Sequence, residues 1–215
     1  MSENNTPKFT SVRFLQLTDE DLRGLGAIAA HWALAEHFTN SLLSSLSSCR
    51  DGQASQLEPE EIISFERKTR TLKKLLRSVC ANFPTHREIG LALVTAGKEL
   101  ANERNIVAHW VSSRSGSANA PTIQFAKIQQ PPAPVSVTHS HWTTAELFDL
   151  ADHIADWWTD LNRFWLALII DGPLASMTTW HGPKHKGRSL DANSFRTIGQ
   201  NRRISTRGKR ESQLP

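Results

Sequence analysis

The chain has 215 residues, of which 39% are hydrophobic, and a formal net charge of +4 at pH 7. This length suits one domain with a tail and can bury a core without disulfides or metals. The two cysteines, Cys49 and Cys80, form no CxxC pair and no metal-ligand cluster, which excludes a disulfide framework and favours a reducing compartment. The N-terminal residues are polar, and the longest apolar run, 164–170, is far shorter than the roughly 20 residues of a membrane span. We therefore expect a cytoplasmic protein with no membrane partner.

Two long helices are predicted in the first part of the chain. The first begins at Thr18, a suitable N-cap, and its apolar residues recur at spacings of three and four until the small and polar stretch 47–56. The second begins near Pro59, which suits a first helical turn. Its early acidic residues are Glu58, Glu60, Glu61 and Glu66, and the basic residues after them are Arg67, Lys68, Arg70, Lys73, Lys74 and Arg77. Acids first and bases last suit the helix dipole, and the basic wall of a binding groove is the other interpretation of the same charges.

Two more helices and a hairpin are predicted after residue 84. Thr85 and Glu88 have the spacing of a capping box, which predicts a third helix that ends near the polar stretch 112–121. The segments 122–129 and 135–141 alternate between apolar and polar residues, which indicates a small β-hairpin. A second capping-box pattern then opens the fourth helix, which ends at an Asp-Gly-Pro sequence.

These elements predict an all-α fold. We expect an up-down four-helix bundle over residues 18–172, with the β-hairpin at about 121–141 between the third and fourth helices. We expect residues 1–17 to form an N-terminal arm. Residues 173–215 lack sustained periodicity and hold nine Lys and Arg residues against two acidic ones, so we expect a disordered basic tail. The tail is either a solvated end or an arm that raises affinity for RNA, DNA or another acidic partner.

The predicted third helix carries a polar motif, ERNIVAHW, at residues 103–110. At about 100° per residue, His109 lies opposite the apolar stripe, and Asn105 lies one turn earlier on the same side. Lys98, Asn102 and Ser112 share that polar side. Arg104 lies about 140° around the helix from His109. The two side chains therefore converge only if the long Arg bends back or a two-fold dimer brings two copies of the helix together.

An Arg followed by a polar residue, with a His four to six positions beyond it, is the shared motif of the HEPN superfamily (higher eukaryotes and prokaryotes nucleotide-binding domains). The segment RNIVAH at 104–109 resembles that motif, and the predicted bundle resembles the family's architecture over about residues 18–172. The resemblance implies an all-α homodimer, frequently a metal-independent ribonuclease of toxin–antitoxin, defence or RNA-processing systems. Many members are instead non-catalytic modules that bind RNA or protein. The toxin-type subgroup has Tyr two residues after the His, where this chain has Val111.

The motif residues suit RNA cleavage, because RNA supplies its own nucleophile, the 2′-OH. Arg104 would hold the phosphate and stabilise the transition state, His109 would act as acid or base, and Asn105 would be a supporting donor. This mechanism needs no metal and no other cofactor, and it spares DNA. The candidate RNA-binding residues are Lys98, Asn102, Trp110 and Ser112. The expected partners are RNA, a second copy of the chain, and a protein antitoxin or regulator. The alternative interpretation is a non-catalytic module, in which Arg104 pairs with a nearby Glu and His109 bonds locally.

Overall fold

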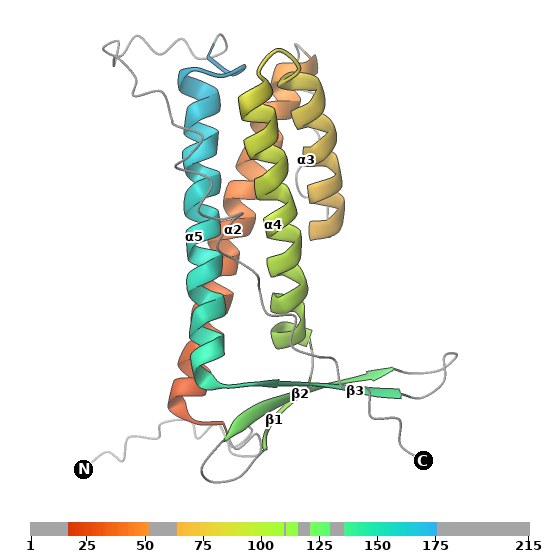
Figure 1. The fold of residues 1–215 in the computed structure, drawn as a ribbon, viewed down its shortest axis with the longest axis vertical. Coiled ribbons are helices and arrows are strands. Elements are labelled where there is room, and N and C mark those ends of the chain that lie inside the picture. The colour runs from red at the N-terminus through yellow and green to blue at the C-terminus, as the bar shows by residue number, and fades with distance from the viewer. Residues whose placement is uncertain (1–16, 52–63, 110, 116–120, 130–135, 176–215) are drawn as a thin grey trace, which may run out of the picture. The chain divides into compact units, whose positions relative to one another are not determined.

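The computed structural model describes residues 17–51, 64–109, 111–115, 121–129 and 136–175. In this part of the chain the elements are α2 (Asp19–Asp51), α3 (Phe65–Val79), α4 (Pro84–His109), β1 (Val111–Ser115), β2 (Thr122–Gln129), β3 (Ser136–Trp142) and α5 (Thr144–Ile170) (Figure 1). The described part of the protein is therefore mostly helical, with one small sheet whose strands follow α4 and precede α5 in the sequence. No described helix combines the length and apolar character needed to cross a membrane. The predicted N-terminal arm and basic tail lie almost wholly outside the described residues.

The described residues form two compact units. Of the described residues, the sheet unit contains those from 17 to 28 and those within 103–151, which include all three strands. The helical unit contains those within 29–102 and those from 152 to 175, which include all of α3. The helices α2, α4 and α5 contribute residues to both units.

The helical unit is built around the indole of Trp157 on α5. This buried ring stacks with Trp32 of α2 at a centroid distance of 6.3 Å and meets Phe65 of α3 edge-on at 6.0 Å. Its Nε1 donates a hydrogen bond of 2.9 Å to the carbonyl oxygen of Leu93 on α4, so the polar atom of a buried side chain has a partner. A Cβ at Gly97 of α4 would overlap the Trp157 ring. Glycine at this position therefore lets α4 approach α5 closely.

Two contacts along α5 show that α2 and α5 run in the same direction in the helical unit. Trp157 stacks with Trp32, and eight residues later in α5 the Nε1 of Trp165 donates to the Oγ of Ser45 at 3.1 Å. Both contacts advance together along the two helices, as they do only in a parallel pair.

Helix α4 runs against this direction. Gly97 lies at Trp157, while Gly90, earlier in α4, lies at Phe164, which is later in α5. Leu76 of α3 also contacts Gly90, and α3 starts beside Trp157 at Phe65, so α3 runs parallel to α5. Three helices of this unit thus share one direction, and α4 opposes them.

This arrangement differs from the up-down order predicted from the sequence, in which the first and fourth helices are antiparallel. The sequence predicts that the first helix ends at the small and polar stretch 47–56 and that the second begins near Pro59. Instead α2 continues to Asp51 and α3 begins at Phe65, so the 13 residues 52–64 separate the two helices. A connection of that length spans up to about 40 Å. The 15 residues of α3 rise only about 22 Å, so the chain has enough length to return before α3 begins.

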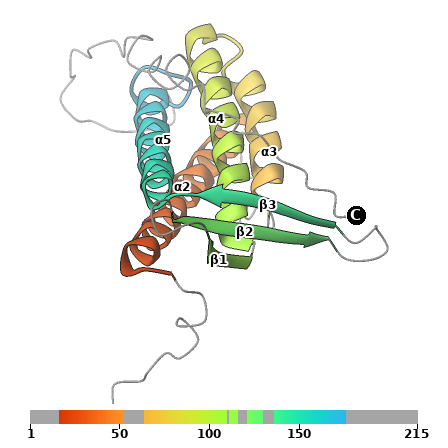
Figure 2. The ribbon, with the colours of Figure 1, turned by 60° about the horizontal axis from the view of Figure 1, so that its bottom comes forward.

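The sheet unit contains three antiparallel strands in the order β1-β2-β3 (Figure 2). The pairing of β2 with β3 places Ile123 opposite Trp142 and Phe125 opposite Ser140. Ile123 and Phe125 are buried, so the sheet has one apolar face. The sequence pattern did not predict β1, which pairs with β2 and places Ser112 opposite Phe125. Its residues VSSRS lack the apolar alternation from which a strand is predicted.

We predict opposite effects of alanine at two helical glycines. Gly97→Ala should lower the free energy of unfolding by about 1–3 kcal/mol, because the new methyl group displaces the Trp157 ring. Gly26→Ala should raise it by about 0.5–1 kcal/mol, because nothing lies within 4 Å of the added Cβ and alanine restricts the unfolded chain. Urea unfolding of both variants measures these changes. Equal effects at the two positions would contradict the packing described for Trp157.

Candidate functional site

The motif residues Arg104, Asn105 and His109 lie in the last turns of α4, in the part of the helix that belongs to the sheet unit. Helix α4 ends at His109, and both His109 and Asn105 are exposed. They are four residues apart, so they lie on one side of the helix. This exposure agrees with the helical-wheel prediction that His109 faces away from the apolar stripe, whose residue Leu100 is buried.

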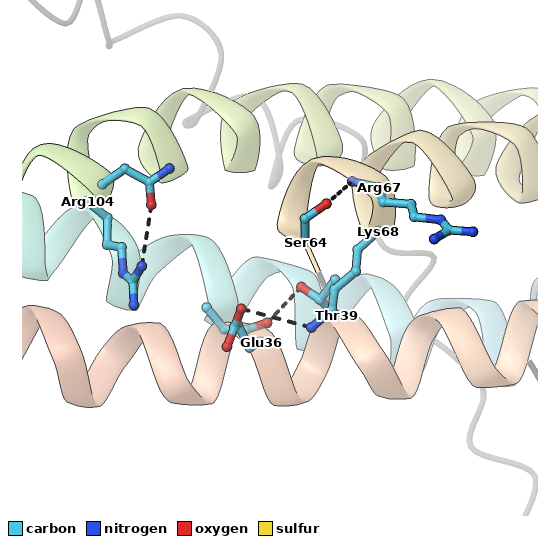
Figure 3. A network of polar contacts seen from close by, with 8 residues as sticks. Glu36, Thr39, Ser64, Arg67, Lys68 and Arg104 are labelled. Atoms are coloured by element: carbon cyan, nitrogen blue, oxygen red, sulfur yellow. Dashed lines mark hydrogen bonds and ion pairs between the residues drawn. The ribbon is translucent and has the colours of Figure 1, made fainter. Parts of the chain in front are cut away.

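Arg104 turns its guanidinium towards Asn105. The side chain is half-buried, and its Nη1 donates to Oδ1 of Asn105 at 3.4 Å (Figure 3). This distance is long for a hydrogen bond, so the contact is weak and orients the Arg104 side chain without holding it rigidly. Because Asn105 shares its side of the helix with His109, the bend brings the cation nearer to that side than the helical wheel alone places it. The structure thus groups Arg104 with Asn105, and Asn105 with His109.

The other candidate residues are distributed differently. Lys98 and Asn102 are exposed on the part of α4 that belongs to the helical unit. Ser112 is half-buried on β1, on the same sheet face as Phe125. Trp110 lies outside the described residues. Of the three candidates that the structure describes, Ser112 alone belongs with the motif residues in the sheet unit.

A buried carboxylate that the sequence reasoning missed holds the sheet unit together. Asp21 of α2 has no exposed surface, and its Oδ1 accepts a hydrogen bond of 2.6 Å from the Oγ1 of Thr144 on α5. Its Oδ2 accepts from the backbone N–H of Thr18 at 2.8 Å and lies 3.9 Å from Nη1 of Arg114 on β1. The available sequence signal was the spacing of Thr18 and Asp21, which also predicts the cap where α2 begins. One carboxylate therefore joins two helix starts and a strand.

The pKa of Asp21 reflects competing effects. Burial alone would raise it, but hydrogen bonds from Thr144 and Thr18 and the positive charge of Arg114 favour the ionised form and hold the pKa below its ordinary value of 3.8. The Nε of Arg114 is itself buried and has no hydrogen-bond partner. Within the described residues, this half-buried side chain meets Asp21 through its Nη1.

Other residues with catalytic or ligating chemistry do not form a second centre in the described part of the chain. His139 and His141 share one face of the sheet, and Nδ1 of His139 is bonded to Nε2 of Gln124 at 2.6 Å. No group of three or more His, Cys, Asp or Glu residues among the described residues could hold a metal ion. Burial raises the pKa of the Cys80 thiol to about 11, which disfavours the thiolate that a nucleophile requires.

Comparison of the chain with known proteins gives no matching family model, no matching curated protein and no matching solved structure. A function for this chain therefore has to be inferred from the chemistry and positions of the residues at the end of α4.

We predict a pH-dependent cost for Asp21→Asn. The folded pKa of Asp21 lies below the unfolded value, so its ionised form stabilises the protein above about pH 4, and this contribution is lost as the pH falls through the folded pKa. The variant should be less stable by about 1–3 kcal/mol at pH 7. Its deficit relative to the wild type should shrink below pH 4. Urea unfolding at pH 7 and pH 3 measures both values.

The matched control is Asp19→Asn, which removes an exposed carboxylate from the same helix start. Its effect should be small at both pH values. A deficit for Asp21→Asn that stays constant between pH 7 and pH 3 would show that the charge of Asp21 contributes nothing to stability.

Proposed function

We propose that this protein is a metal-independent endoribonuclease of the HEPN type, which cleaves RNA by attack of the 2′-OH. The observation that supports the proposal is the exposed pair Asn105 and His109 at the end of α4, with the Arg104 guanidinium bonded to Asn105. An imidazole, a guanidinium and an amide then lie within one turn and a half of one helix, and His109 is open to a ligand.

The proposed reaction transfers a phosphoryl group within the RNA chain. A base takes the proton of the 2′-OH, O2′ bonds to phosphorus, and the bond from phosphorus to O5′ breaks. An acid then protonates O5′, which leaves a 2′,3′-cyclic phosphate and a 5′-hydroxyl. The imidazole of His109 can take either proton-transfer role, because an imidazole can both accept and donate a proton. The permanent charge of Arg104 stabilises the additional negative charge on the phosphate oxygens.

A homodimer would supply the second acid–base group. The exposed side of α4 offers one imidazole in the sheet unit, whereas the reaction has an acid step and a base step. A two-fold arrangement of two α4 ends would place two His109 residues and two Arg104 residues around one phosphate. In this proposal the toxin–antitoxin, defence or RNA-processing role, and any antitoxin or regulatory partner, follow from the RNase activity.

The second candidate function is a non-catalytic module that binds RNA or a protein through the same surface. It is favoured by the bond between Arg104 and Asn105, because an Arg that contacts its own helix can serve a binding surface without any chemistry. Both candidates use the end of α4, and they differ in whether the phosphodiester bond is broken.

We predict that the purified protein cleaves a labelled single-stranded RNA in EDTA and leaves the matching DNA intact. The expected product ends in a 2′,3′-cyclic phosphate. His109→Ala and Arg104→Ala should each lower the cleavage rate by about a hundredfold or more, because each removes a group that acts in the transition state. Gel analysis of the labelled products measures the rates.

The matched controls are His37→Ala and Arg23→Ala, which remove an exposed imidazole and an exposed guanidinium from α2. Both should cleave at the wild-type rate. Binding of RNA with no cleavage by any form would favour the non-catalytic module, and cleavage that survives both motif substitutions would sink the proposed site.

A further inference from the structure

The outer side of α3 carries a set of exposed cations, which we call the basic face of α3. It consists of Arg67, Arg70, Lys74 and Arg77. Their spacings of three, four and three residues place them along one side of the helix over nearly three turns. The opposite side of α3, with Leu72, Leu75 and Leu76, is buried in the helical unit.

The helix dipole explains Arg77, which stands in the last turn of α3, but it does not explain the rest of this face. The sequence suggested acids early and bases late, but α3 begins at Phe65, and Glu66 is the acidic residue of its first turn. Ser64 caps the helix by accepting the N–H of Arg67 at 3.3 Å, so Arg67 itself stands in that first turn (Figure 3). A cation there lies beside the positive end of the dipole, where it is disfavoured. Glu58, Glu60 and Glu61 lie outside the described residues.

Ion pairing within the described residues does not explain it either. Arg70 bonds Glu66 at 3.3 Å, with both side chains largely exposed, and such surface pairs contribute little. The other three cations of the face make no ion pair in the described part of the chain. Lys68, which points inwards, lies 3.9 Å from Glu36 of α2. Figure 3 shows Lys68 extending to Glu36 and Arg67 extending away from it.

The chemistry of the face selects the class of partner. The remaining exposed or half-exposed residues of this side are Glu66, Thr71, Lys73 and Ser78, so no apolar side chain stands among the cations. Protein interfaces have an apolar or aromatic centre, which this face lacks. A membrane-bound amphipathic helix inserts its apolar side, and here that side is packed inside the protein. A polyanion is the partner that this face fits.

We propose that the basic face of α3 binds the phosphate backbone of single-stranded RNA. Three of its four cations are arginines, whose guanidinium groups bind phosphate oxygens in pairs. The choice of RNA rests on the proposed ribonuclease function. Binding through phosphates alone is independent of base sequence, so this face supplies affinity while the end of α4 supplies the chemistry.

The test compares RNA affinity and its salt dependence in the full chain, with His109→Ala present to keep the RNA intact. The test variant adds Arg67→Gln, Lys74→Gln and Arg77→Gln. Fluorescence anisotropy with a labelled single-stranded RNA measures Kd between low and physiological salt. Loss of three phosphate contacts should lower the slope of log Kd against log salt by about 2 and weaken binding by about tenfold or more.

Two further variants make the result specific to this face. Arg23→Gln, Lys127→Gln and Arg163→Gln together remove the same charge from exposed positions on α2, β2 and α5, and they should leave the slope unchanged. Glu66→Gln removes the acid next to Arg70 and should tighten binding. The test variant should unfold at the same temperature as its parent or above it, because repulsion between cations is relieved.

An unchanged slope in the test variant, or an equal loss in the control variant, would overturn the proposal. So would displacement of the RNA by polyglutamate as effective as displacement by unlabelled RNA, which would indicate an acidic protein partner. Cleavage by the wild type with an unchanged slope would leave the ribonuclease standing and remove the role of α3. A reduced slope in a protein that never cleaves RNA would support binding by the basic face of α3 and remove the proposed ribonuclease function.

Discussion

The packing of the helical unit depends on one indole ring. Trp157 contacts residues of α2, α3 and α4, and its single polar atom is satisfied by a backbone carbonyl of α4. The ring fits because α4 has no side chain at Gly97. The large indole of Trp157 on α5 thus fits against the glycine at position 97 of α4. A larger residue at 97 would collide with the ring, and a smaller residue at 157 would leave a cavity.

The sheet unit uses a polar centre for the same purpose. Asp21 is buried, but it accepts hydrogen bonds from a helix cap and from Thr144, and it lies near Arg114. A charged group in this position is stable only while these partners stay in place. The polar centre therefore ties the first turn of α2 and the first residue of α5 to Arg114, the fourth residue of β1. In the same unit the buried apolar residues Ile123 and Phe125 cover one face of the sheet. Apolar contacts have no directional preference, so they fix the positions of the neighbouring elements less closely than these hydrogen bonds do.

The sequence predicted most of the elements and less of their arrangement. Four helices were predicted from apolar spacing and caps, and the capping box at 143–146 is present as hydrogen bonds between Thr143 and Glu146. Strand β1 was missed because its serines show no alternation, and it is a strand because it pairs with β2. The relative directions of the helices could not be predicted from the residues. The length of a connection does not say whether the next helix runs antiparallel or parallel to the one before it.

For the candidate site, the sequence predicted which side chains are exposed and not which contacts they make. Periodicity places Asn105 and His109 on the exposed side of α4, as observed, since a helical wheel needs only local geometry. The bend of Arg104 towards Asn105 and the buried charge of Asp21 depend on rotamers and on residues distant in sequence. The unbalanced charge of α3 became visible only when the helix start was known, because the acids at 58–61 had appeared to belong to its first turn.

The junction between α4 and β1 has a consequence for the history of this protein. A single residue separates His109, the last of the helix, from Val111, the first of the strand. The covalent chain therefore keeps the Cα of His109 within about 8 Å of the Cα of Val111. Lengthening or shortening that junction by one position would turn the strand's side chains to the opposite face and change where the strand stands relative to His109. Insertions and deletions should be excluded there during evolution, and a designer who moves the motif to another bundle would have to carry the strand with it.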